Sequence, residues 1–171
     1  MAAGEGTRLR PLTERWPKPV LPIDGRPVLA TLLRELVAAG IDRATVVTGH
    51  LAEQVESLAG DGSGFGLAID FVRQPRADGS ADTVVRALAG GARLPAVVSA
   101  ADTVYTPGDV GRLLAAFAAS GVAGAMTVRR EPPPGPGRAA VLIRDGLVQR
   151  VLDDDPANPL GGAPASGARG R

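Results

Sequence analysis

Apolar positions between residues 29 and 128 alternate between a helical and a strand period. The helical period is clearest at the start of this stretch, where one face carries Leu29, Leu32, Leu33, Leu36 and Val37. Gly40 follows and suits a helix end, and Ser80 suits a helix start as an N-cap. The pattern predicts helices over 29–37, 51–58, 80–88 and 110–119, and strands over 44–47, 67–72, 96–100 and 123–128.

This alternation predicts the fold class. Parallel strands need crossover connections, so we expect an α/β, Rossmann-like fold with a mostly parallel sheet and helices on both faces. Further along, apolar runs at 139–143 and 147–152 flank Asp145-Gly146, which predicts a C-terminal β-hairpin. We therefore expect a core domain over 1–152 and an irregular tail, rich in Pro, Gly and Ala, over 153–171.

Composition narrows the chemistry. The 171 residues include 19 basic and 18 acidic side chains, so net charge offers no argument for nucleic acid or a membrane as partner. The chain has no cysteine, which excludes thiolate metal sites and cysteine nucleophiles. Its one histidine, His50, is interpreted as a surface or capping residue. We expect a cytoplasmic protein whose phosphate binding, if any, depends on locally placed Arg and Lys.

The densest motif is a glycine-rich segment with two cations. It runs Ala2-Ala3-Gly4-Glu5-Gly6-Thr7-Arg8 and is followed by Pro17-Lys18-Pro19. Glycines let backbone N–H groups approach a polyphosphate, and an arginine binds phosphate oxygens bidentately. A lone Gly-x-Gly favours a tight turn, but Arg8 and a lysine between two prolines at this spacing favour a phosphate site.

These residues resemble the signature loop of the sugar nucleotidyltransferases, which include guanylyl-, thymidylyl- and uridylyltransferases of sugar 1-phosphates. The resemblance covers residues 1 to about 152 and implies the nucleotide-diphospho-sugar transferase type of fold. It implies that Arg8 and Lys18 are the catalytic cations. It also implies a nucleotide-binding loop that comprises Ala2, Ala3, Gly4, Gly6, Thr7 and Arg8. The family carries an apolar strand directly before this loop, and we expect that strand to be missing here.

Two further segments match the family. Gln74 with Gly79-Ser80 corresponds to a glutamine and a turn near the nucleobase, with serine in place of the usual threonine. Asp102 corresponds to the aspartate that coordinates Mg²⁺, although Ala101 replaces the glycine that usually precedes it. In addition, Asp155 stands where the family has a lysine that helps to hold the sugar phosphate.

The resemblance implies transfer of a nucleotidyl group from a nucleoside triphosphate to a sugar 1-phosphate, with Mg²⁺ as cofactor and pyrophosphate as product. A homo-oligomer is left open as a further partner. One alternative is a non-catalytic, nucleotide-binding regulatory domain of the same fold, which the changes at Ala101 and Asp155 favour. Another is a dinucleotide-binding oxidoreductase, but Leu9 stands where the third glycine of its fingerprint belongs.

Overall fold

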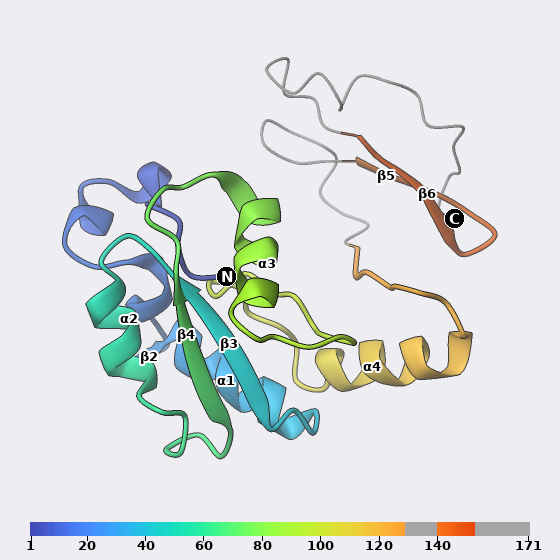
Figure 1. Ribbon diagram of the computed structural model, residues 1–171, viewed down its shortest axis with the longest axis horizontal. Helices are drawn as coiled ribbons and strands as arrows, with labels where there is room; N and C mark the ends of the chain where they lie inside the picture. Colours follow the sequence, from blue (N-terminus) through green and yellow to red (C-terminus); the bar gives the residue numbers. More distant parts are fainter. Residues whose placement is uncertain (129–139, 153–171) are drawn as a thin grey trace. The chain divides into compact units, whose positions relative to one another are not determined.

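The structure, a computed structural model, describes residues 1–128 and 140–152 (Figure 1). The chain divides into two compact units, Met1–Ala123 and Gly124–Arg171. The expected tail over 153–171 and Asp155 lie outside the described residues. Within the described ranges, no helix is long and apolar enough to cross a membrane.

A parallel strand pair forms the centre of the first unit. β3 (Arg43–Thr48) pairs with β4 (Ala68–Arg73), and Val46 lies opposite Phe71. Helix α2 (Ala52–Ala59) makes the crossover between them, as parallel pairing requires. The predicted strands 44–47 and 67–72 and the predicted helix 51–58 are thus confirmed to within two residues at either end.

Helices cover both faces of this pair. On one face, Val46 and Ile69 join a buried core with Leu29 and Leu33 of α1 (Val28–Ala38) and with Val55 of α2. Because strand side chains alternate between faces, Val47 and Val72 point to the other face. There the end of α3 (Gly79–Ala89) lies so close that a Cβ on Gly90 would sit 2.4 Å from Cγ2 of Val72. The expected two-sided α/β sheet is confirmed.

The predicted strands over 96–100 and 123–128 are wrong, because neither segment pairs as a strand among the described residues. A strand needs a neighbouring backbone to complete its hydrogen bonds. Beside the first segment, the Met1 amino group donates to Ser99 O at 2.8 Å and Ala101 N–H donates to Met1 O at 2.8 Å. These two bonds involve a single residue of the opposing backbone, too short a partner for a ladder. In the second segment Met126 is 46% exposed and Val128 45% exposed, so these side chains are not part of a packed strand face.

Two hairpins account for the other strands of the described residues. β5 (Ala140–Arg144) and β6 (Leu147–Leu152) pair antiparallel around Asp145-Gly146, whose φ angles of 52° and 75° suit a two-residue hairpin turn, as predicted. β1 (Pro22–Ile23) and β2 (Arg26–Pro27) form a second hairpin around Asp24-Gly25, which the hydrophobic pattern did not predict. In the part of the chain that the structure describes, the remaining helices are α4 (Asp109–Ser120) and the 3₁₀ helices η1 (Thr7–Leu9), η2 (Leu12–Glu14) and η3 (Lys18–Val20).

Candidate functional site

The glycine-rich loop starts against the carboxyl end of β3. Ala2 N–H donates to Val47 O at 2.7 Å, and Ala2 forms a parallel bridge with Thr48. Ala2 and Ala3 are both buried, and Ala3 O accepts a hydrogen bond from His50 N–H at 3.4 Å. The loop therefore leaves the sheet at the edge where α/β proteins bind their ligands.

The two glycines of the loop have different surroundings. Gly6 has a φ of 67°, and a Cβ there would lie 2.9 Å from Cγ2 of Thr13 and 3.0 Å from Cε of Lys18. A Cβ on Gly4 would meet nothing within 4 Å. Gly6 is therefore required by the packing of the loop itself, whereas the backbone at Gly4 is open to an approaching ligand.

The structure brings one predicted cation to the predicted metal ligand. Lys18 Nζ lies 3.6 Å from Asp102 Oδ2, with the two side chains 29% and 42% exposed. Arg8 is exposed and forms no ion pair with the residues that the structure describes, whereas Arg10 is paired with Glu5 at 3.0 Å. Lys18 and Arg8 thus offer positive charge beside the loop, and Asp102 offers a hard oxygen next to Lys18.

The surroundings of Asp102 fit a magnesium ion that arrives with phosphate. In the described part of the chain, no group of three or more His, Cys, Asp or Glu side chains is placed to hold a metal. Mg²⁺ rarely uses such cages, because it retains waters and takes one or two carboxylates together with substrate phosphates. A half-exposed carboxylate beside the glycine-rich loop is compatible with that donor set.

Gln74 is buried in the turn that follows β4. Its backbone N–H donates to Thr48 O at 2.7 Å, so this turn starts beside the same strand end as the loop. Its side-chain Nε2 donates to Gly79 O at 3.3 Å and to Asp82 Oδ2 at 2.7 Å, and its Oε1 accepts from Thr83 Oγ1 at 2.9 Å. Most of the hydrogen-bonding capacity of the amide is therefore used to hold the turn.

The same turn orders the start of α3. Arg86 Nε donates to Asp82 Oδ2 at 2.6 Å, and this bond, followed by that from Gln74, holds the pKa of Asp82 below its usual value. The helix already begins at Gly79, which has a φ of 90°, and its N-cap is Asp78. Ser80 therefore lies inside the first turn, and its expected role as N-cap is wrong. Both Gly79 and Ser80 are exposed.

Sequence reasoning overlooked Thr48, which links these segments. Thr48 is 0% exposed, bridges to Ala2 on one side, and accepts from Gln74 on the other. Its Oγ1 donates to Glu56 Oε1 at 2.8 Å, and Arg73 binds Glu56 in turn at 2.7 Å. The only signal in the sequence was a hydroxyl residue at the end of an apolar strand.

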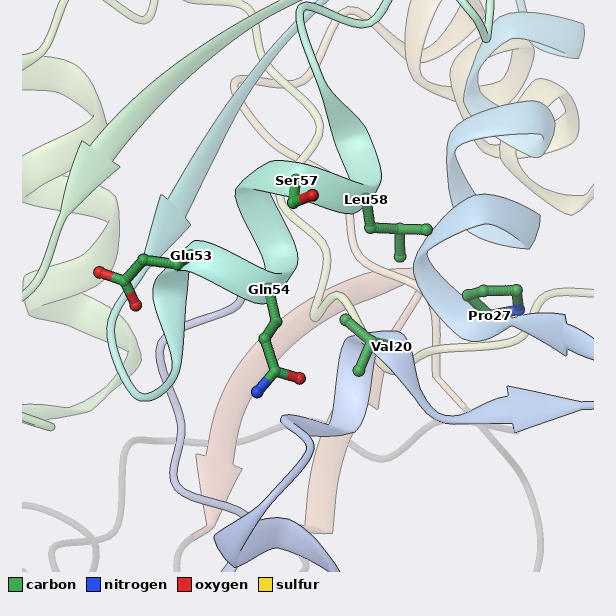
Figure 2. A pocket seen from close by; sticks show the side chains of 6 residues that line it. All are labelled: Val20, Pro27, Glu53, Gln54, Ser57 and Leu58. Carbon is green, nitrogen blue, oxygen red and sulfur yellow. The ribbon is translucent and has the colours of Figure 1, made fainter.

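A surface hollow lies nearby but is not this site. It has a volume of about 430 Å³ and lies between α2 and the segments that carry Val20 and Pro27 (Figure 2). Its lining residues are Val20, Pro27, Glu53, Gln54, Ser57 and Leu58. None of the side chains predicted to bind nucleotide or metal lines it, so the chemistry of the glycine-rich loop is separate from this hollow.

Comparison with known proteins identifies the family. Residues 1–141 match the family described as nucleotidyl transferase. This chain belongs to the nucleotidyl transferase family. Its glycine-rich loop and its Lys18–Asp102 pair fall within the matched residues. The oxidoreductase alternative is thereby discarded.

Several family members are similar to this chain. It is 34% identical over 157 residues to CMP-5'-(3-aminopropyl)phosphonate synthase of Streptomyces rubellomurinus, covering 90% of this chain and 24% of that protein. It is 36% identical to the bifunctional protein GlmU of an Acidovorax species, covering 92% and 33%. It is 46% identical over 71 residues to UTP–glucose-1-phosphate uridylyltransferase of Synechocystis, covering 42% and 18%. The chain thus spans a third or less of the length of each of these three relatives.

Among solved structures, UDP-glucose pyrophosphorylase complexed with UDP-glucose aligns with a TM-score of 0.56 at 24% identity. The alignment covers 68% of this chain and 51% of that one. At this identity the likeness concerns the fold, and it agrees with the α/β architecture of the first unit.

Proposed function

We propose that this transferase moves a nucleotidyl group from a nucleoside triphosphate to a sugar 1-phosphate and releases pyrophosphate. The observation that carries the proposal is the Lys18–Asp102 pair, 3.6 Å apart, beside the loop at the end of β3. A cation and a hard-oxygen carboxylate next to an open glycine backbone are the parts that phosphoryl-group chemistry needs.

In this mechanism the residues position the substrates and stabilise charge. Backbone N–H groups from Gly4 onward approach the triphosphate, and Arg8 binds its oxygens bidentately. An oxygen of the acceptor phosphate attacks the α-phosphorus, and the bond from that phosphorus to the bridging oxygen of pyrophosphate breaks. Lys18 offsets the negative charge that builds up, and no covalent enzyme intermediate forms. Asp102 would hold Mg²⁺, which supplies Lewis-acid polarisation of the phosphate when bound.

The turn after β4 is proposed to bind the nucleobase. Gly79 and Ser80 are exposed, so the N–H of Gly79 and the hydroxyl of Ser80 are open to a base edge. Gln74 retains one free lone pair on Oε1, because Thr83 uses the other. Its main contribution is to hold Gly79 in place.

A second candidate acceptor is an organic phosphonate. Support comes from the match to CMP-5'-(3-aminopropyl)phosphonate synthase over 90% of this chain, and from 50% identity over 54 residues to 2-aminoethylphosphonate cytidylyltransferase of Lancefieldella rimae. A phosphonate offers the same nucleophilic oxygens as a phosphate monoester. The loop, Lys18 and Asp102 would therefore act in the same way, with CTP as the expected donor.

A pyrophosphate-release assay tests both candidates. The chain is incubated with Mg²⁺ and each of ATP, CTP, GTP, UTP and dTTP, crossed with glucose 1-phosphate, mannose 1-phosphate, N-acetylglucosamine 1-phosphate and 2-aminoethylphosphonate. Release with a sugar 1-phosphate supports the first candidate, and release with CTP and the phosphonate alone supports the second. Triphosphate binding without release from any pair would instead favour the regulatory-domain alternative.

A further inference from the structure

The turn between β3 and α2 contacts two limbs of the chain. The first limb is the start of the glycine-rich loop, and the second is the segment 13–15 that follows the loop. His50 N–H donates to Ala3 O in the first limb, and His50 Nε2 lies 2.8 Å from Thr13 O in the second. A carbonyl oxygen only accepts, so Nε2 carries the hydrogen. Thr13 in turn restrains Gly6, because its Oγ1 donates to Gly6 O at 2.9 Å. One histidine therefore ties the two limbs together.

Gln54 makes a second tie to the same limb. Its Nε2 donates to Arg15 O at 2.8 Å, and its side chain extends from α2 into the space beside Val20 (Figure 2). The bonds of His50 and Gln54 span 37 and 39 positions of the sequence.

In the described chain, no other hydrogen bond links residues 4–17 to a distant part of the sequence. Every other hydrogen bond made by residues 4–17 stays within positions 4–20, mostly as turns that connect residues three or four apart. Turns of this kind shape a segment but do not place it relative to the sheet. The bonds from His50 and Gln54 are therefore the hydrogen bonds that join the segment 13–15 to the region of β3 and α2, and they act together with the packing of the buried Thr13 and Pro17.

We propose that His50 and Gln54 are positioning residues that hold the glycine-rich loop ready for the triphosphate, an inference that rests on the proposed function. Neither side chain needs to touch a substrate. A loop that is ordered before binding spares the ligand the entropy of ordering it. Loss of one tie removes a hydrogen bond and lets the limb move, which raises the KM for triphosphate while the chemical step is retained.

The experiment compares four variants with the wild-type chain. His50→Ala and Gln54→Glu each remove a donor, and His50→Gln keeps an N–H at a similar reach. Ser57→Ala is the matched control, because Ser57 lies one turn along α2 and its side chain makes no hydrogen bond with any described residue. Loop motion is read from time-resolved fluorescence anisotropy of Trp16, which is next to Arg15 and is the only tryptophan of the chain.

The expected result has two parts. In His50→Ala and Gln54→Glu, the fast depolarisation of Trp16 increases and the KM for the triphosphate rises roughly two- to tenfold, the effect of losing one net hydrogen bond. In the same variants kcat stays close to wild type. His50→Gln recovers most of both readouts, and Ser57→Ala changes neither.

Three results would overturn the inference. The first is that the Trp16 anisotropy and the KM for triphosphate in both donor-removing variants equal those of Ser57→Ala. The second is that Trp16 becomes mobile while the KM does not change. The third is that the two variants have a lower melting temperature but an unchanged KM per folded molecule, which would indicate a purely structural role. If His50→Ala does not fold, Gln54→Glu decides, because Gln54 is only half-buried. If the wild-type chain turns over no triphosphate at all, the proposed function fails, and the anisotropy still tests the anchoring by itself.

Discussion

Substitution of the two loop glycines by alanine separates the packing of the loop from its approach to a ligand. In Gly6→Ala the new methyl group would lie 2.9 Å from Cγ2 of Thr13, at a backbone φ of 67°. Lys18 is 29% exposed, whereas Thr13 is 1% exposed and is bonded to Gly6 O. The variant must therefore strain the backbone, displace Thr13, or both.

The magnitude follows from these two costs. An alanine in the left-handed region costs roughly 1–2 kcal/mol. Forcing a methyl group against a packed neighbour costs about 1–3 kcal/mol. The stiffer unfolded chain offsets roughly 0.4–1 kcal/mol of this. We expect Gly6→Ala to lower the free energy of unfolding by roughly 1–4 kcal/mol, which for a domain of this size is about 2–4 °C in melting temperature per kcal/mol.

Gly4→Ala is the matched control, because its methyl group meets nothing within 4 Å. Its stability should stay within about 0.5 kcal/mol of wild type. Its affinity for triphosphate should fall, because in the proposed mechanism the methyl group would stand where the phosphates approach the backbone.

Thermal melts followed by far-UV circular dichroism and by Trp16 emission measure both variants. If the loop opens locally, Trp16 reports the loss at a lower temperature than the dichroism does. The reasoning is refuted if Gly6→Ala melts like wild type by both probes, or if Gly4→Ala destabilises the chain equally.

Further predictions concern charge. Arg8→Ala and Lys18→Ala should each lower turnover by roughly 10²-fold, the scale for losing a contact to transition-state charge, while circular dichroism shows a folded chain. Asp102→Asn should abolish the Mg²⁺ dependence of triphosphate binding, measured by titration calorimetry with and without the metal. Asp82 should titrate below its usual pKa of 3.8 in NMR. Because its pKa is lowered in the folded state, it stabilises the fold above about pH 3.8, and this contribution is lost as pH falls through the lower value. Asp82→Asn should remove that part of the acid sensitivity and loosen the turn at Gln74.

Many elements of this fold could be predicted from the sequence, because they depend on residues that are close together in the chain. Helical and strand periods located α1, α2, α3, β3 and β4, because each period depends on which face of one element is buried. The same holds for the Asp145-Gly146 hairpin, since its backbone angles depend on two adjacent residues. The glycine-rich loop was recognisable for a similar reason, as its cations and glycines are close together in the chain.

Pairing across the chain was decided only by the tertiary structure. Residues 96–100 have the composition of a strand, yet they remain irregular because a strand exists only with a partner along its length. Gln74 is predicted from the sequence to lie near a base, and only the fold shows that its amide also holds the turn through Gly79, Asp82 and Thr83.

The loop shows the same division most clearly. Its sequence predicts that Arg8 and Lys18 serve phosphate, because residue type and spacing carry that chemistry. That Lys18 lies beside Asp102, and that His50 and Gln54 hold Thr13 and Arg15, depends on how segments far apart in the chain pack against the loop. Hydrogen bonds between residues this far apart in the chain have no periodic signature, since they arise from where the packed elements place each donor and acceptor.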